Sequence, residues 1–130
     1  MKTRFFSFIL MAFALTVSCS QGQNKAVLDA KAFADKVNTA TGATLIDVRT
    51  PEEYAAGHLA NARNIDWNGG HFEHMVMDLD KSKPVLVYCL KGGRSASAAS
   101  KMRSMGFKEV YELEGGIEKW EAAKLPVVKE

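Results

Sequence analysis

The stretch that decides the fold is VLVYCLKGGRS, residues 85–95. It begins with a short apolar run of the kind found in parallel strands that are buried on both faces. Cys89 ends this run, and a loop with two adjacent glycines follows it. A helical pattern of small and apolar residues then continues from Ser95 to Met105. This order predicts that Cys89 lies at the carboxyl end of a strand and faces the N-terminus of a helix.

That position favours ionisation of the thiol. The first turn of a helix has backbone N–H groups without intrahelical partners, and the helix dipole adds roughly half a positive charge there. A cysteine at such a place ionises more readily than a free thiol, whose pKa is about 8.5. Gly92 and Gly93 let the loop turn its N–H groups toward the sulfur, and Lys91 and Arg94 add positive charge. The pattern predicts a thiolate nucleophile in an anion-binding loop. The alternative is a buried, inert cysteine at a strand end.

Three motifs resemble those of single-domain rhodaneses, the thiosulfate sulfurtransferase family. CLKGGRS at 89–95 is similar to the family's active-site loop. LIDVRTPEEYAAGHLANA at 45–62 is similar to its N-terminal signature, and EGGIEKW at 114–120 to its C-terminal one. The motifs occur in the family's order. We therefore expect residues 27–130 to form a rhodanese-like α/β domain, a three-layer sandwich with a mostly parallel central sheet and helices on both faces.

The resemblance implies a sulfur relay through Cys89. The thiolate would take the sulfane sulfur of a small anionic donor such as thiosulfate and hold it as a persulfide. A thiol, a protein thiol or cyanide would then accept the sulfur. Neither a metal nor an organic cofactor is implied, and Lys91 and Arg94 would attract the anionic donor. The residues expected to bind substrate and persulfide are those of the loop: Leu90, Lys91, Gly92, Gly93 and Arg94.

Two other functions stay open at this point. The first is phosphatase or arsenate-reductase chemistry. Dual-specificity phosphatases related to this fold family have a loop one residue longer, whereas four residues separate Cys89 from Arg94 here, which favours sulfur. The second is a persulfide carrier or a partner-binding module that does not turn over many times. Sulfur loading without multiple turnover would indicate a carrier.

The first 19 residues have the pattern of a signal peptide. Lys2 and Arg4 are followed by an apolar run at 5–17, which is shorter than the roughly 20 residues of a membrane-spanning helix. A small residue before Cys19 resembles a bacterial lipobox, with Cys19 as the lipidated residue. Thr16 departs from this motif, since an aliphatic residue is usual there.

An ordinary secretory signal is the alternative to a lipobox. With the lipobox, we expect an exported protein on the periplasmic side, attached to the membrane only through a lipid on Cys19. Residues 20–26 would then be a polar tether. Cys89 would be the remaining thiol of the exported chain, so any sulfur that it carries must leave to an external acceptor.

Composition argues for a folded domain without a nucleic-acid partner. Hydrophobic residues make up 47% and charged residues 25% of the chain, as in globular proteins. The 17 basic and 15 acidic residues give a net charge of +2, and two of the basic residues, Lys2 and Arg4, lie in the leader. The rest of the chain is therefore neutral and lacks the basic excess of nucleic-acid-binding domains.

Four polar groups outside the loop deserve a prediction. Asp47 and Arg49 follow a predicted strand, and we expect them to serve as scaffold or to line the rim of the site, without a catalytic role. His58 follows a helix end and is expected to be fixed by hydrogen bonds to backbone, a role that the resemblance also implies. The cluster at 71–74 holds two histidines and a glutamate, but its spacing is that of a solvated helix face and not of a metal site.

Hydrophobic periodicity and capping residues predict the remaining elements. Asp29 is a candidate N-cap for the first helix, and Thr50-Pro51-Glu52-Glu53 has the form of a capping box with proline at the first helical position. Strands are expected at 44–48, 64–67, 85–88 and 108–113. Helices are expected at 30–42, 51–57, 71–79, 95–105 and 117–123.

Overall fold

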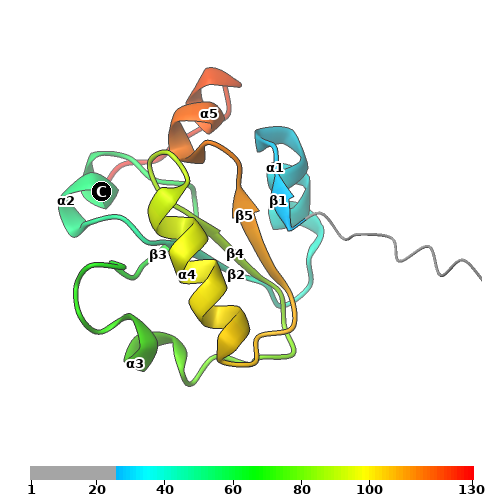
Figure 1. Ribbon diagram of the computed structural model, residues 1–130. Coiled ribbons are helices and arrows are strands. Elements are labelled where there is room, and N and C mark those ends of the chain that lie inside the picture. The colour runs from blue at the N-terminus through cyan, green and yellow to red at the C-terminus, as the bar shows by residue number, and fades with distance from the viewer. Residues whose placement is uncertain (1–25) are drawn as a thin grey trace, which may run out of the picture.

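The computed structural model describes residues 26–130, which form one sheet with helices on both faces (Figure 1). The strand order is β1-β5-β4-β2-β3, and each pairing between neighbours is parallel. The predicted α/β sandwich is therefore confirmed, and its sheet is parallel throughout. The predicted signal peptide, the lipidation at Cys19 and the tether up to residue 25 lie outside the described residues.

The elements alternate along the chain as predicted. The strands are β1 (Val27–Leu28), β2 (Thr44–Asp47), β3 (Arg63–Asn64), β4 (Val85–Tyr88) and β5 (Val110–Leu113). The helices are α1 (Ala30–Thr39), α2 (Pro51–Ala56), α3 (Phe72–Val76), α4 (Gly93–Ser104) and α5 (Gly116–Ala122).

Several boundaries differ from the sequence-based expectation. The strand β3 is shorter than the expected 64–67 and begins one residue earlier, at Arg63, and α1 ends at Thr39 rather than at residue 42. The helix α4 begins at Gly93, two residues before the predicted start at Ser95. The helix α3 is shorter than the predicted 71–79, and its N-cap, His71, makes no side-chain capping bond. The strand β1 was missed, because two residues are too few to show an alternating pattern.

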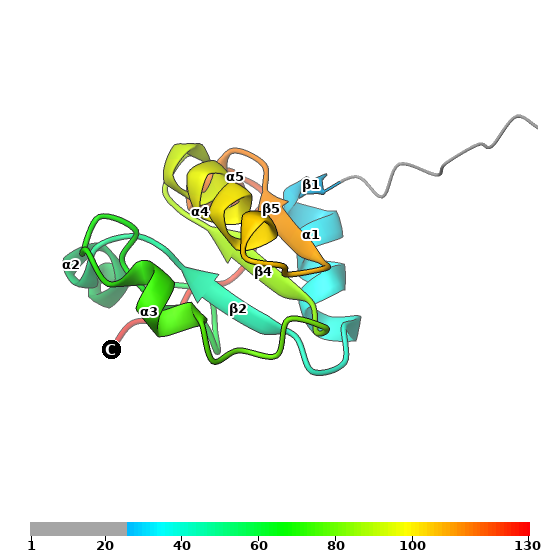
Figure 2. The ribbon, with the colours of Figure 1, turned by 60° about the horizontal axis from the view of Figure 1, so that its bottom comes forward.

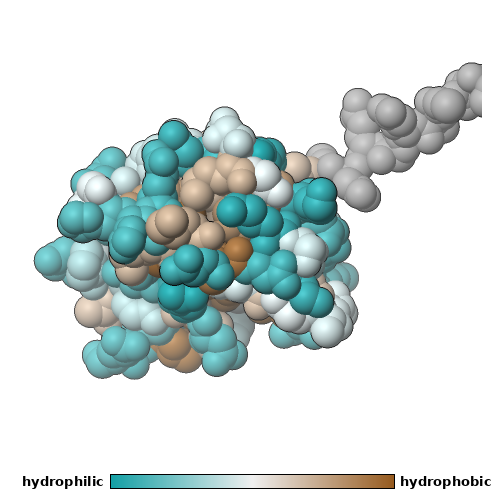
Figure 3. Space-filling model, turned by 90° about the horizontal axis from the view of Figure 1, so that it is seen from below, coloured by the Kyte–Doolittle hydropathy of each residue, from teal (hydrophilic) through white to brown (hydrophobic). Residues whose placement is uncertain are grey.

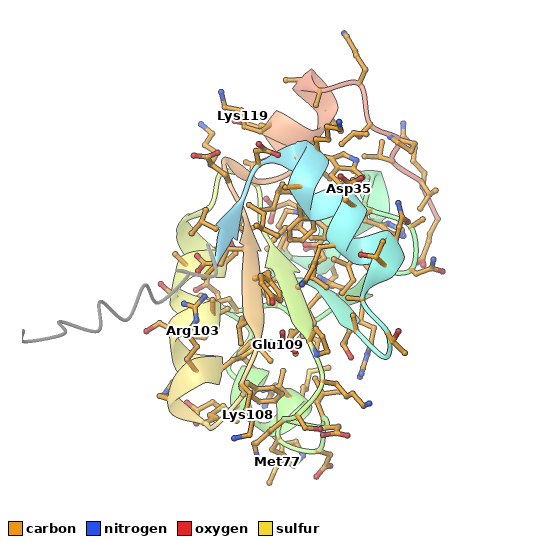
Figure 4. All side chains as sticks on the ribbon, turned by 90° about the vertical axis from the view of Figure 1, so that its right-hand side faces the viewer. Asp35, Met77, Arg103, Lys108, Glu109 and Lys119 are labelled. Carbon is orange, nitrogen blue, oxygen red and sulfur yellow. The ribbon has the colours of Figure 1, made fainter. Side chains whose placement is uncertain are left out.

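The two halves of the core follow from alternation along β4. Val85 and Val87 point to one face of the sheet, where they pack with residues of α3 and α4. Leu86 and Tyr88 point to the other face, where they pack with residues of α1 and α5. All four side chains are essentially inaccessible to solvent. Figure 4 shows the resulting layers, with α4 on one side of the strands and α1 on the other.

Small residues on α4 bring this helix close to the sheet. Ala98, Ala99 and Met102 are completely buried against the strands. Since β2 and β4 are parallel neighbours, their carboxyl ends meet at the same edge of the sheet. Figure 2 shows both strands running toward α2 and the start of α4. Packing thus places the start of α4 directly at the end of β4, where Cys89 lies.

Two of the exposed apolar side chains belong to α3 and the residue that follows it. Met75 and Met77 are 45% and 49% exposed, and Met77 lies at the lower end of the molecule in Figure 4. The underside, toward which α3 lies, shows hydrophilic residues with apolar ones among them (Figure 3). Within residues 26–130, no helix has the length and apolar character needed to cross a membrane.

Candidate active site

Cys89 occupies the place that the sequence predicted. It directly follows β4, and α4 begins four residues later at Gly93. Gly92 precedes the helix as its N-cap with φ +110°, a left-handed conformation that favours glycine. The turn at Gly92 folds the chain back on itself. As a result, Cys89 faces the first turn of α4 although it lies at the end of the preceding strand.

The sulfur of Cys89 lies beside two hydrogen-bonding groups of the loop and of α4. The backbone N–H of Gly92 lies 3.0 Å from Sγ, and the hydroxyl Oγ of Ser95 lies 3.4 Å from it. Burial, with 1% of Cys89 exposed, opposes ionisation most strongly. The Ser95 hydroxyl and the N–H groups of Ser95, Gly92 and Lys91 outweigh it, so the pKa of the Cys89 thiol is lowered. The cradle therefore stabilises a negative charge on sulfur.

Two carbonyl groups at the start of the loop are bound by α5. The N–H of Ile117 donates to the Cys89 carbonyl at 2.9 Å, and the N–H of Glu118 donates to the Leu90 carbonyl at 3.2 Å. Gly116 makes this contact possible: a Cβ there would overlap the Leu90 carbonyl, and its φ of +65° also favours glycine. The N-termini of two helices thus contact one loop. The first turn of α4 faces the sulfur, and the N–H groups at the start of α5 bind the carbonyl groups of Cys89 and Leu90.

Arg94 crosses from α4 to α2. Its Nη1 and Nη2 donate to the two carboxylate oxygens of Glu53 at 2.7 and 2.9 Å. This two-point contact is the geometry in which a guanidinium binds a carboxylate best. The side chains of Arg94 and Glu53 are 25% and 30% exposed. Arg94 therefore fastens the start of α4 to α2, and its charge is paired with that of Glu53.

Glu53 also caps its own helix. Its Oε2 accepts the N–H of Thr50 at 3.0 Å, while its own N–H donates to the Thr50 hydroxyl, which is the predicted capping box. The hydrogen bond from Arg94 is the main reason why the pKa of Glu53 falls to about 2. Glu53 is thus ionised over the whole neutral range, and it receives bonds from both α2 and α4.

Asp47 and Arg49 form a second, buried pair. Nε and Nη2 of Arg49 contact the Asp47 carboxylate, with a shortest distance of 2.6 Å. Arg49 also donates to the carbonyl of Gly57 at 2.7 Å, and Asn64 donates to the Arg49 carbonyl. The pair therefore ties the end of β2 to the end of α2. This arrangement is that of a scaffold, one of the two roles expected from the sequence.

His58 is fixed as expected. Its Nδ1 lies 2.9 Å from the Tyr54 carbonyl, and its ring stacks on that of Tyr54. Its backbone pairs with Val128 in the C-terminal segment. As for the cluster at 71–74, no three metal-ligating side chains come together anywhere in the part of the chain that the structure describes.

The remaining loop residues differ in exposure. Leu90 is half-buried and packs on the core beside α1 and α5, whereas Lys91 and Gly93 are exposed. Lys91 therefore presents its ammonium group to solvent next to the cradle. Of the two predicted cations, Lys91 faces solvent while Arg94 is engaged with Glu53.

Three contributors to the site were not recognised in the sequence. The sequence pattern marks Ser95 only as the end of the loop motif, whereas in the structure its hydroxyl, in the first turn of α4, lies beside the sulfur. The sequence predicts Glu53 only as a capping residue, and no local signal connects it to Arg94, 41 residues away. Gly116 was read as part of a turn, and its contact with the loop depends on tertiary packing.

Comparison with known proteins places these features in a family. The family model described as rhodanese-like domain matches residues 28–123. A thiosulfate sulfurtransferase GlpE from Ectopseudomonas mendocina is 38% identical over 81 residues, which cover 62% of this chain and 72% of that protein. A GlpE from Pseudomonas putida is 40% identical over 85 residues, with the same shares covered.

Solved structures agree with this match. A rhodanese-related protein from Thermoplasma volcanium superimposes with a TM-score of 0.70 at 30% identity, covering 80% of this chain and 98% of that one. A rhodanese-like domain from Anabaena gives a TM-score of 0.72 at 26% identity, covering 81% and 80%. The range of the family match, 28–123, includes Cys89 and the helices α1 to α5.

Proposed function

Because the chain belongs to the family of rhodanese-like domains, we propose that it is a sulfurtransferase acting through a persulfide on Cys89. The donor is a small anion with a sulfane sulfur, such as thiosulfate. The acceptor is a thiophilic group, either a thiol or cyanide in an assay. The observation that carries the proposal is the position of the Cys89 sulfur among the donors of Gly92 and Ser95.

The first step makes the persulfide. The Cys89 thiolate attacks the outer sulfur of thiosulfate, a new S–S bond forms, and the S–S bond of the donor breaks. Sulfite leaves with the bonding electron pair. The negative charge ends on the outer sulfur of the Cys89 persulfide, where the N–H groups at the start of α4 would stabilise it. The lowered pKa of Cys89 supplies the attacking thiolate.

The second step regenerates the enzyme. An acceptor nucleophile attacks the outer sulfur of the persulfide, the S–S bond breaks, and Cys89 leaves as a thiolate. Among residues 26–130, Cys89 is the one cysteine, so no neighbouring thiol of this domain can take the sulfur as a disulfide partner. The acceptor is therefore an external molecule, which can be a thiol on another protein.

Intact mass spectrometry tests this function directly. The purified domain is incubated with thiosulfate beside Cys89→Ser, and both are then treated with cyanide. We expect the wild-type mass to rise by one sulfur atom and to return to its starting value with cyanide, while Cys89→Ser stays unchanged. Thiocyanate formation over many turnovers identifies an enzyme, whereas one loading without turnover identifies a carrier. Hydrolysis of a phosphate ester in place of sulfur loading would contradict the proposal.

We also propose that the protein is exported and anchored by a lipid on Cys19. The support is the leader sequence, with its charged start, its short apolar run and a cysteine after a small residue. The test is metabolic labelling with radioactive palmitate, followed by separation of membrane and periplasmic fractions. We expect a labelled membrane protein that loses its label in Cys19→Ala. An unlabelled, periplasmic wild type would indicate simple signal cleavage.

A further inference from the structure

The charges around Cys89 come from two cations in different situations. Lys91 is exposed and takes part in none of the ion pairs found within residues 26–130. Arg94 donates from Nη1 and Nη2, its two terminal guanidinium nitrogens, to Glu53. At neutral pH the Arg94–Glu53 pair carries no net charge. An anion that approaches Cys89 therefore meets one free cation and one that is already neutralised.

Arg94 is close enough to Cys89 to matter if it were released. It is the second residue of α4, whose first turn faces the sulfur. Its pKa is raised mainly by the hydrogen bond to Glu53, and the charges of Glu53, Cys89 and Asp66 contribute in the same direction. Of these carboxylates, Glu53 makes the direct contact. Pairing with Glu53 therefore reduces the positive electrostatic potential that Arg94 produces at the sulfur.

We propose that Glu53 is a positioning residue that limits the preference of Cys89 for anionic reaction partners, because it neutralises Arg94 and holds it against α2. This inference rests on the proposed sulfur transfer and deepens it, since it concerns the charge of the molecules that reach the same thiol. Glu53 acts through Arg94 and does not contact the sulfur. Its carboxylate tunes the selectivity of the site, whereas Cys89 performs the chemistry and the N–H groups around the sulfur stabilise the charge.

Simple electrostatics gives the size of the effect. Removing one unit charge several ångströms from a reacting anion, at a solvent-exposed site, changes its local concentration by about threefold. Salt near 1 M shortens the screening length to roughly 3 Å and should abolish most of this change. A positive Arg94 without its partner should therefore accelerate reactions of anions with Cys89, whereas it should leave reactions of neutral molecules with the same thiolate nearly unchanged.

The test compares alkylation of Cys89 by iodoacetate, an anion, with alkylation by iodoacetamide, which is neutral. In both reactions the thiolate displaces iodide, a carbon–sulfur bond forms and the carbon–iodine bond breaks. The quantity compared between variants is the rate constant for iodoacetate divided by the rate constant for iodoacetamide. Both rate constants depend on the fraction of thiolate, so this fraction cancels in the ratio at one pH. A change in the ratio between variants therefore reports a change in local charge. The full domain is used, and thiosulfate is not needed.

Four variants separate the possible causes. Glu53→Gln should raise the ratio about threefold, since glutamine keeps the shape and can still cap α2. Glu52→Gln is the matched control, because it removes the same charge from an exposed position in the same helical turn and should leave the ratio nearly unchanged. Arg94→Gln should lower the ratio, because Glu53 is left unpaired. The double variant Glu53→Gln with Arg94→Gln should return close to the wild-type ratio.

Two outcomes would overturn the inference. If Glu53→Gln changes both rate constants in parallel and leaves the ratio unchanged, Glu53 acts only on the structure of the loop. If Glu52→Gln shifts the ratio as much as Glu53→Gln, the effect comes from net charge and not from the pair with Arg94. Failure of thiosulfate to load the wild type would contradict the sulfur transfer, and the alkylation ratio would still decide the role of Glu53.

Discussion

The molecule contains two arginine–carboxylate pairs near the same edge of the sheet, and they differ in burial. The Asp47 and Arg49 side chains are 0% and 5% exposed, whereas those of Glu53 and Arg94 are 30% and 25% exposed. Both pairs are bidentate and have similar distances. The same chemical groups therefore serve different purposes, since water can replace a partner only at the exposed pair.

The buried pair supports the exposed one. Arg49 holds the carbonyl of Gly57 at the end of α2, and Asn64 holds the carbonyls of Asp47 and Arg49. The helix that carries Glu53 is thereby fixed to the sheet. Burial makes the Asp47–Arg49 pair costly to break, because an unpaired ion would remain without solvent. Partial exposure lowers the free-energy cost of breaking the Glu53–Arg94 pair, because water can solvate the separated charges. This pair is therefore suited to setting the charge near Cys89.

The largest effect should follow from Asp47→Asn. This change keeps the shape of the side chain but leaves the charge of Arg49 buried and uncompensated. We expect the free energy of unfolding to fall by about 3–5 kcal/mol, as for other broken buried ion pairs. Urea denaturation measures the change, with Glu52→Gln as a surface control. A loss below about 1 kcal/mol would show that burial does not distinguish the two pairs.

The next largest effect should come from Gly116→Ala, which disturbs the contact between α5 and the Cys89 loop. Its Cβ would overlap the Leu90 carbonyl, and alanine is strained at a φ of +65°. We expect a loss of about 2 kcal/mol or more and a higher Cys89 pKa, because the N–H cradle loses its support. Urea denaturation and the pH dependence of iodoacetamide alkylation measure the two effects.

Gly93→Ala is the matched control for that change. A Cβ at Gly93 meets no atom within 4 Å, and Gly93 does not have a left-handed φ. Since alanine is favoured over glycine in helices, this variant should be neutral or slightly more stable. Equal losses for the two variants would mean that the loop tolerates no side chain, and the specific contact with α5 would not be the cause.

The smallest effect on stability should follow from Glu53→Gln. The Glu53–Arg94 pair is partly exposed, and ion pairs at the protein surface contribute roughly 0–1 kcal/mol at neutral pH. The pKa of Glu53 is lowered from 4.5 to about 2. The contribution of the ion pair to the free energy of unfolding is therefore complete above pH 4.5 and is lost as the pH falls through about 2. The difference in the free energy of unfolding between wild type and variant, measured by urea denaturation, should therefore shrink as the pH falls from 4.5 to about 2. A difference that grows toward acid pH would contradict the pairing.

Local patterns predicted most of the elements for physical reasons. The buried run 85–88, the capping box at Thr50 and the glycines after Cys89 each act within a few residues, so the strand, α2 and the loop could be recognised directly. Short α3 and β1 were misjudged, because their limits depend on caps and pairing partners rather than on periodicity. The α/β class followed from the alternation of the elements.

The amino-acid sequence by itself determined that a cysteine would follow a buried strand and face a helix N-terminus, since both signals are local. Only the tertiary structure decided how that cysteine is surrounded. Ile117 and Glu118 reach the loop carbonyls because α5 packs behind the loop, and Glu53 reaches Arg94 because β2 and β4 are neighbours in the sheet. Contacts between distant residues depend on the order of the strands, which no single segment encodes.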